Sequence, residues 1–188
     1  IDHTLNLESL ILFVNEDISE IVRLPIKVED RVIIGNTFAT RDLMRTLHLN
    51  SRYYVLVLGQ GKARLIEAFN DKAIKEIGKP FPFENQQLFG LSKQEAGDST
   101  LLLNRMSEYY NQVDKHVNEV RKNSGLPVLI SSDESNFHEY LKVADHKDTI
   151  YQIHLGGSRL EDKEDAIVKD AWGIIKKYVD ERNNKRIS

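Results

Sequence analysis

The strongest pattern along the chain is an unbroken apolar run at Tyr53–Leu58, which predicts a strand buried on both faces of a sheet. Turn residues at 59–61 follow this run, and the apolar pattern returns at Ala63–Phe69 as a second strand. A further turn at residues 70–71 leads into a shorter strand at Ala73–Ile77. Because the turns are short, we predict that these three strands are antiparallel neighbours.

A long helix is predicted next, beginning at Asp98 or Ser99 and ending near Asn123, because apolar residues recur there at three- and four-residue spacing. Gly125 and Pro127 end the helix. The apolar stripe of this helix consists of Leu102, Met106, Tyr109, Val113, Val117 and Val120.

Strands and helices alternate after the long helix. Strands are predicted at Val128–Ile130 and Thr149–His154, with a helix capped by Asp133 between them. Ser158 and Glu161 have the spacing of a capping box and predict the start of a last helix. The order from residue 52 is therefore β-β-β-α-β-α-β-α. Since crossover connections make the later strands parallel to the first, we predict an α/β domain over residues 51–188 with a ribonuclease H-like mixed sheet.

A short β-rich segment precedes this domain. Residues 9–14 and 18–24 predict a hairpin, and Val28–Ile34 is compatible with a third strand. A short helix is predicted after Thr40, with Leu43, Met44 and Leu47 on one face. Because an isolated hairpin is only marginally stable in water, we interpret residues 1–50 as the end of an upstream N-terminal domain or as an appendage packed on the main one.

Composition narrows the class of protein. The 188 residues include 26 Lys and Arg against 29 Asp and Glu, so the net charge of −3 predicts no overall basic field for nucleic acid. The absence of cysteine excludes disulfides and thiolate metal sites and is typical of a cytoplasmic protein. No apolar run is long enough to span a membrane, and no signal peptide is recognised. Four basic residues near the second strand are interpreted as a solvated sheet edge rather than a nucleic-acid surface: Arg52, Lys62, Arg64 and Lys72.

Nucleases with a ribonuclease H-like fold hold two metal ions with clustered carboxylates. The first strand here contains no carboxylate, which leaves Glu108 and Asp133 as an incomplete set of metal ligands. Two histidine–glutamate pairs at helical spacing offer two ligands each and are interpreted as ordinary surface pairs: His116 with Glu119, and His138 with Glu134. We predict no cofactor, and a metal-dependent nuclease or phosphatase stays an alternative hypothesis.

Several dispersed stretches between about residues 20 and 180 resemble the bacterial archaeo-eukaryotic release factor family, and its third subfamily most of all. The stretches that carry the resemblance are Arg31–Phe38, Ser51–Leu56, Lys62–Glu67, Leu126–Ile130 and Ala171–Ile175. The resemblance implies that residues 52 to about 155 correspond to the middle domain of archaeal and eukaryotic release factors and of Pelota. That domain is ribonuclease H-like, in agreement with the order of elements.

The resemblance also directs attention to the segment before the long helix, where true release factors carry a Gly-Gly-Gln loop that acts at the peptidyl-tRNA ester. The corresponding residues here, Phe89–Ser99, contain no Gly-Gly-Gln, and the Gly-Gln-Gly at residues 59–61 belongs to a tight turn between strands. Gln94 is the only substitute in the segment, as a weak catalytic candidate. The residues expected to contact ribosome or tRNA are Lys79, Lys93, Gln94 and Arg105.

The sequence is therefore compatible with three functions. The leading hypothesis is a translation-associated module that contacts ribosome or tRNA through residues 78–99 and lacks the usual hydrolytic motif. The second is the metal-dependent nuclease or phosphatase built on Glu108 and Asp133. The third is a non-catalytic protein-interaction domain, which an exposed apolar patch on residues 1–50 would favour. The sequence predicts no oligomeric state.

Overall fold

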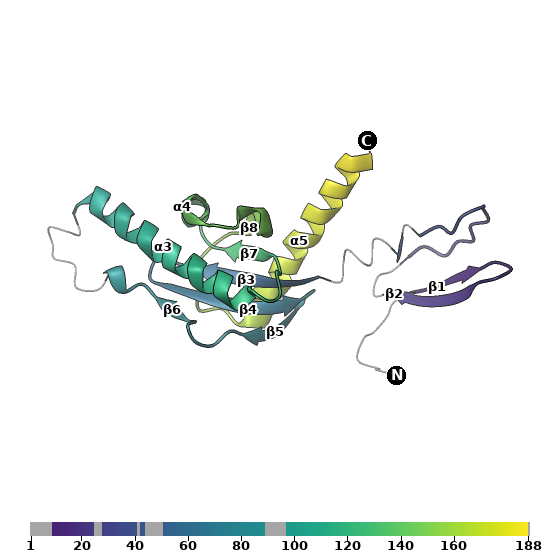
Figure 1. The fold of residues 1–188 in the computed structure, drawn as a ribbon, viewed down its shortest axis with the longest axis horizontal. Coiled ribbons are helices and arrows are strands. Elements are labelled where there is room, and N and C mark those ends of the chain that lie inside the picture. The colour runs from purple at the N-terminus through teal and green to yellow at the C-terminus, as the bar shows by residue number, and fades with distance from the viewer. Residues whose placement is uncertain (1–8, 25–27, 41, 44–50, 89–96, 188) are drawn as a thin grey trace. The chain divides into compact units, whose positions relative to one another are not determined.

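The computed structural model of the chain describes residues 9–24, 28–40, 42–43, 51–88 and 97–187 (Figure 1). The chain divides into two compact units, Ile1–Asn50 and Ser51–Ser188. The second unit is the larger of the two.

The first unit contains the predicted hairpin. Strand β1 (Ser9–Val14) pairs antiparallel with β2 (Ser19–Leu24), which confirms the prediction. The side chain of Asn15 closes the turn, because its Oδ1 accepts hydrogen bonds from the backbone N–H groups of Asp17 at 2.9 Å and Ile18 at 2.6 Å. Apolar side chains on one face of the hairpin remain exposed: Leu10, Leu12, Val14 and Ile21.

The third strand that Val28–Ile34 suggested is wrong. This stretch pairs with neither strand of the hairpin, and Val32 and Ile34 are almost fully exposed. An apolar stretch forms a strand only where a partner edge satisfies its backbone, and none of the described residues supplies one. The helix predicted after Thr40 falls mainly on residues 41 and 44–50, which lie outside the described residues.

A mixed sheet of six strands forms the centre of the second unit, in the order β5-β4-β3-β7-β8 with β6 also paired to β4. The antiparallel meander consists of β3 (Arg52–Leu58), β4 (Lys62–Phe69) and β5 (Lys72–Glu76). The short β6 (Phe83–Glu84) pairs with the beginning of β4. The remaining strands, β7 (Val128–Ser131) and β8 (Ile150–Leu155), are parallel to β3. The predicted order of elements is confirmed, with β6 and two 3₁₀ turns added.

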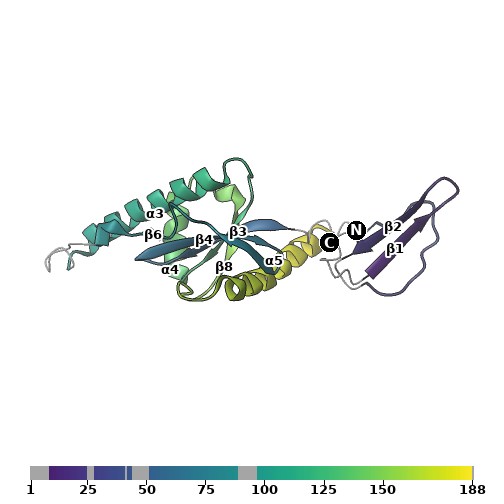
Figure 2. The ribbon, with the colours of Figure 1, turned by 90° about the horizontal axis from the view of Figure 1, so that it is seen from below.

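Helices cover both faces of this sheet (Figures 1 and 2). On one face α3 (Ser99–Arg121) and α4 (Glu134–Val143) pack against alternate side chains of β3 and β7 in a continuous apolar core. On the other face lies α5 (Glu164–Ile187), where Trp172 stacks against Tyr53 with ring centroids 6.3 Å apart. Residues 53–58 are buried on both faces, as their unbroken apolar run predicts.

The first residues of α3, α4 and α5 differ in how well the sequence predicts them. Asp98 caps α3 as predicted, because its Oδ1 accepts from the N–H groups of Thr100 and Leu101 at 3.0 and 3.1 Å. Asp133 occupies the N-cap position of α4 but makes no side-chain capping bond. The predicted start of α5 at Ser158–Glu161 is wrong, since the helix begins at Glu164 and the preceding residues are bound to β4 instead.

A search for membrane spans, confined to the described residues, finds no helix that combines the length and the apolarity needed to cross a bilayer.

Candidate functional site

Three parallel strands of the second unit, β3, β7 and β8, end at the same edge of the sheet, which we call the carboxyl edge. Leu58, Ser131 and Leu155 are their last residues. A hydrogen bond of 2.9 Å from the Ser132 N–H to the Leu155 carbonyl joins two of these strand ends. Because open α/β sheets commonly bind ligands outside the carboxyl ends of their strands, this edge is the natural place to search for a site.

The tight turn between β3 and β4 begins at the β3 end of the carboxyl edge. The turn is closed by a hydrogen bond of 3.0 Å from the Gly59 N–H to the Lys62 carbonyl. Asn85 is bound to this turn twice, because its backbone N–H donates to the Gly61 carbonyl at 2.8 Å and its Nδ2 donates to the Gln60 carbonyl at 2.7 Å. The stretch that follows β6 is therefore fixed to the sheet at this point.

The described residues on the two sides of residues 89–96 are bound to each other. The 3₁₀ turn η1 (Gln86–Leu88) precedes them, and α3 follows them. Arg105 of α3 connects the two flanks, because its Nη1 donates to the Gln87 carbonyl at 2.9 Å. The place where this segment leaves the core and the place where it returns are thus defined by described residues.

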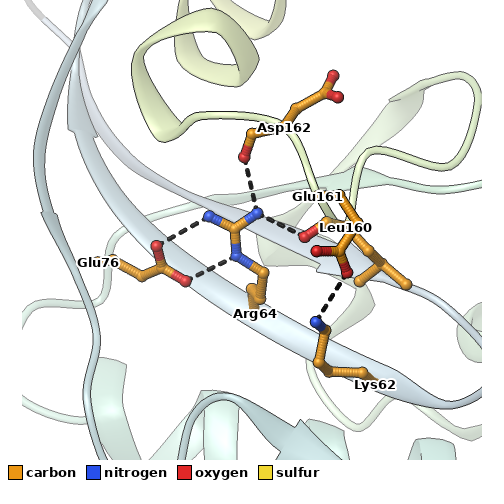
Figure 3. A network of polar contacts seen from close by, with 6 residues as sticks. All are labelled: Lys62, Arg64, Glu76, Leu160, Glu161 and Asp162. Carbon is orange, nitrogen blue, oxygen red and sulfur yellow. Dashed lines mark hydrogen bonds and ion pairs between the residues drawn. The ribbon is translucent and has the colours of Figure 1, made fainter.

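The opposite side of the carboxyl edge is closed by residues 158–162, which we call the strap (Figure 3). Arg64 of β4 holds the strap, because its Nη1 donates to the carbonyls of Leu160 at 2.8 Å and Asp162 at 2.9 Å. The same guanidinium donates from Nε and Nη2 to both carboxylate oxygens of Glu76, at 2.7 and 2.8 Å. Such bidentate charge-assisted bonds are among the strongest in proteins, so Glu76 fixes the Arg64 guanidinium from which Nη1 binds the strap.

Protonation of this cluster follows from its geometry. The hydrogen bonds from Arg64 hold the pKa of the Glu76 carboxyl below its ordinary value, and the same pair raises the pKa of the Arg64 guanidinium. Both groups are therefore charged at neutral pH. Lys62 and Glu161 add a more exposed ion pair of 3.0 Å beside them.

An apolar contact completes the closure of the edge. A Cβ placed on Gly59 would lie 2.5 Å from Cδ1 of Leu160, so the strap covers the turn directly after β3. The position directly after β3 is therefore occupied by a glycine turn and a leucine side chain.

The positions of the two predicted acidic residues, Glu108 and Asp133, do not support the nuclease hypothesis. Glu108 is exposed on α3 and accepts a hydrogen bond of 3.0 Å from Gln112 of the same helix. Asp133 is exposed at the start of α4. Within the part of the chain that the structure describes, no three His, Asp or Glu side chains are grouped so that they could hold a metal ion.

The predicted histidine pairs and contact residues lie in several places. His138 and His116 approach Glu134 and Glu119 at 3.7 and 4.0 Å respectively, as two-membered surface pairs. Lys79 is exposed between β5 and β6, whereas Arg105 binds the Gln87 carbonyl. Lys93 and Gln94 lie outside the described residues.

The interpretation of the basic residues near β4 as a solvated edge is wrong for Arg64 and holds for Lys72, which is exposed on the edge strand β5. Strand β4 lies between β3 and β5, so it is not an edge strand. Arg64 is buried and paired with Glu76, and Arg52 is paired with Glu67. The signal that was missed is the presence of Glu67 and Glu76 at positions that antiparallel pairing brings beside these arginines.

A buried carboxylate between α3 and α4 was also missed. Asp114 accepts hydrogen bonds from the Tyr140 hydroxyl at 2.8 Å, from Asn118 Nδ2 at 2.9 Å and from the Asp145 N–H at 3.0 Å. Burial, followed by the nearby Asp114 charge, raises the pKa of Tyr140, which therefore stays a donor. With all these bonds made, the cluster joins the two helices and offers no open position to a ligand.

The sequence model of bacterial archaeo-eukaryotic release factor family 3 matches residues 52–188. No curated protein matches the chain.

Two solved structures, both archaeal, are similar at low identity. A crystal structure of the archaeal translation termination factor aRF1 is 16% identical, with a TM-score of 0.41 over 94% of this chain and 55% of its own. A structure described as an archaeal protein is 13% identical, with a TM-score of 0.39 over 89% of this chain and 51% of its own. The chain thus spans about half the length of the solved structures that it matches.

Proposed function

Since this chain belongs to bacterial archaeo-eukaryotic release factor family 3, we propose that it acts in translation, as a module that contacts ribosome or tRNA. The contact is made by residues 78–99, which include the segment between β6 and α3. The observation that carries the proposal is how the described residues beside this segment are held: Asn85 is bound to the turn at the carboxyl edge, and Arg105 of α3 is bound to Gln87. A segment mounted in this way is suited to binding because its ends are already ordered.

The proposed module is not a hydrolase of the Gly-Gly-Gln type, because no such motif stands before α3. The proposed contact residues are Lys79 between β5 and β6, Arg105 of α3, and Lys93 and Gln94 in the segment itself. Of these, Arg105 contributes through the position of Gln87 as well as through its charge. We propose a cytoplasmic location, which follows from contact with ribosomes.

The sheet supports a more specific description of the fold as ribonuclease H-like. Three antiparallel strands are followed by two parallel ones, in the order β5-β4-β3-β7-β8, with helices on both faces. We propose this topology for residues 51–188, and residues 1–50 as part of a separate N-terminal domain. The carboxyl edge of this fold, used for catalysis in nucleases, is here used to mount a binding segment.

Sedimentation of the full chain with ribosomes tests the proposal. At low salt, where contacts to phosphate are strongest, the protein is expected to move with the ribosomal fraction. Raising the salt from about 50 to 200 mM is expected to release it, because phosphate contacts are replaced by ions. Absence of co-migration at low salt would contradict the proposal.

A second function, binding of a partner protein, is favoured by the exposed apolar face of the β1–β2 hairpin. Leu12 and Ile21 are opposite each other in the register and are 56% and 62% exposed. In-cell cross-linking of the wild type and of a Leu12→Ser, Ile21→Ser variant tests this function. A cross-linked protein lost only in the variant supports the second function, and identical cross-links contradict it.

A further inference from the structure

A buried amide connects three separate elements at the base of the segment. Asn85 follows β6 and is 1% exposed, although its side chain is polar. Besides its two bonds to the β3–β4 turn, its Oδ1 accepts from the Gln87 N–H at 3.0 Å. Its Nδ2 also lies 3.5 Å from Sδ of Met106 on α3. One side chain thus contacts the turn, η1 and α3.

These contacts are directional, which distinguishes Asn85 from an apolar residue that would fill the same space. Burying an amide lowers stability unless its donor and acceptor groups are hydrogen-bonded. In Asn85 both groups are bonded, to one residue that precedes it in the chain and one that follows it. The Gln60 carbonyl fixes the amide against the sheet, and the Gln87 N–H fixes the start of η1 against the amide. This arrangement holds the start of η1 against the carboxyl edge.

We propose that Asn85 is a positioning residue, which sets where the segment between β6 and α3 leaves the sheet and so presents it to ribosome or tRNA. The inference rests on the function proposed above and names the residue on which it depends. Arg105 assists at the other flank by holding the Gln87 carbonyl. Because the base is ordered before binding, less conformational entropy is lost when the partner is met.

The experiment compares Asn85→Ala with Asn136→Ala in the full chain. Asn136 is a matched control, since it is also buried and accepts one hydrogen bond of 2.9 Å, from the Tyr110 hydroxyl, at the interface of α3 and α4. Both variants lose a buried amide, but only one loses the link to η1. Two quantities are measured: amide hydrogen exchange over residues 85–88, and ribosome affinity corrected for the folded fraction.

Asn85→Ala is expected to speed exchange of the Gln87 amide about tenfold, the factor for loss of one hydrogen bond. Ribosome affinity is expected to fall about tenfold as well. Asn136→Ala is expected to lower thermal stability without either effect. Equal losses of affinity in the two variants, or unchanged exchange and affinity in Asn85→Ala, would overturn the proposal.

A second variant covers the case in which Asn85→Ala does not fold. Asn85→Asp keeps the shape and the oxygen that accepts from Gln87, but places an oxygen instead of Nδ2 against the Gln60 carbonyl. It is expected to speed exchange of the residue 85 amide and to weaken ribosome binding, and unchanged values would overturn the proposal. If the wild type binds no ribosomes, the proposed function fails by itself, and the exchange comparison still tests whether Asn85 holds the base.

Discussion

At the scale of single residues, Arg64 and Lys62 are two positions apart on β4 yet differ in what they stabilise. Arg64 is buried and binds one carboxylate and two carbonyls, whereas the Lys62–Glu161 pair is largely open to solvent. Breaking a buried pair leaves a charge without its partner, while exposed pairs contribute little.

Arg64→Met is therefore expected to lower the free energy of unfolding by about 2–3 kcal/mol, a value reduced by the partial exposure of Glu76. Lys62→Met is expected to change it by less than about 0.5 kcal/mol. Urea unfolding measures both, followed by the fluorescence of Trp172, the single tryptophan, which packs on Tyr53. Similar losses in the two variants would contradict the account of the strap.

The Glu76 carboxyl predicts how stability depends on pH. Its pKa is lowered in the folded protein, chiefly by the hydrogen bonds from Arg64. A group of this kind adds stability above its unfolded pKa, and the contribution is lost as pH falls through the folded pKa. Glu76→Gln should therefore be clearly less stable than the wild type at pH 7, and the difference should shrink below about pH 4.5. A difference that grows in acid would show that the sign is wrong.

Gly59 and Gly61, both in the β3–β4 turn, allow a second comparison of two substitutions. A Cβ on Gly59 would meet Leu160 at 2.5 Å and the Lys62 carbonyl at 3.3 Å, whereas a Cβ on Gly61 meets nothing within 4 Å. Gly59→Ala should cost about 1–3 kcal/mol of unfolding free energy, as for overpacking, and Gly61→Ala less than about 0.5 kcal/mol. Since the first clash is with a side chain, Leu160→Ala in the same chain should recover part of the loss. Absence of any recovery would argue against contact between strap and turn.

At the scale of elements, the caps of α3 and α4 allow a direct comparison. Asp98 accepts two backbone hydrogen bonds, and Asp133 at the equivalent position accepts none. Asp98→Ala should lower the free energy of unfolding by about 1 kcal/mol, and Asp133→Ala by only a few tenths, through the helix dipole. Thermal unfolding of both variants measures the difference, and equal shifts would contradict the assigned caps.

The elements predicted from the sequence are those whose pattern is local. The apolar run at 53–58 and the stripe of α3 depend only on periodicity, and both elements are found where they were predicted. The start of α5 was misplaced because Ser158–Glu161 satisfies a local rule that a distant residue overrides. Arg64, which is 96 residues from Leu160, donates a hydrogen bond to the Leu160 carbonyl and holds this stretch outside the helix.

Candidate site residues were harder to predict for the same reason. The segment before α3 was identified from the resemblance and from its length, but the residue that anchors it was not. Asn85 has no periodic neighbours, and its partners at Gln60 and Met106 lie 25 and 21 positions away. Its importance depends on burial, which a polar residue in an irregular stretch does not signal.

At the scale of the whole molecule, the second unit is a layered sheet whose carboxyl edge is closed on one side and carries an anchored segment on the other. The strap and Leu160 close the end of β3, and Asn85 holds the base of the segment against the same turn. The strap and the base of the segment thus both contact the turn at residues 59–61.

The most direct test of this account replaces residues 89–97 with a Gly-Ser segment of equal length and measures the ribosome affinity of both proteins at low salt. The replacement leaves Asn85, Arg105 and the Asp98 cap in place, so thermal stability is expected to remain unchanged. We predict that the wild type binds and that the replacement weakens binding at least about tenfold, or about 1.4 kcal/mol. Equal affinity of the two proteins, or no binding by the wild type, would contradict the central claim.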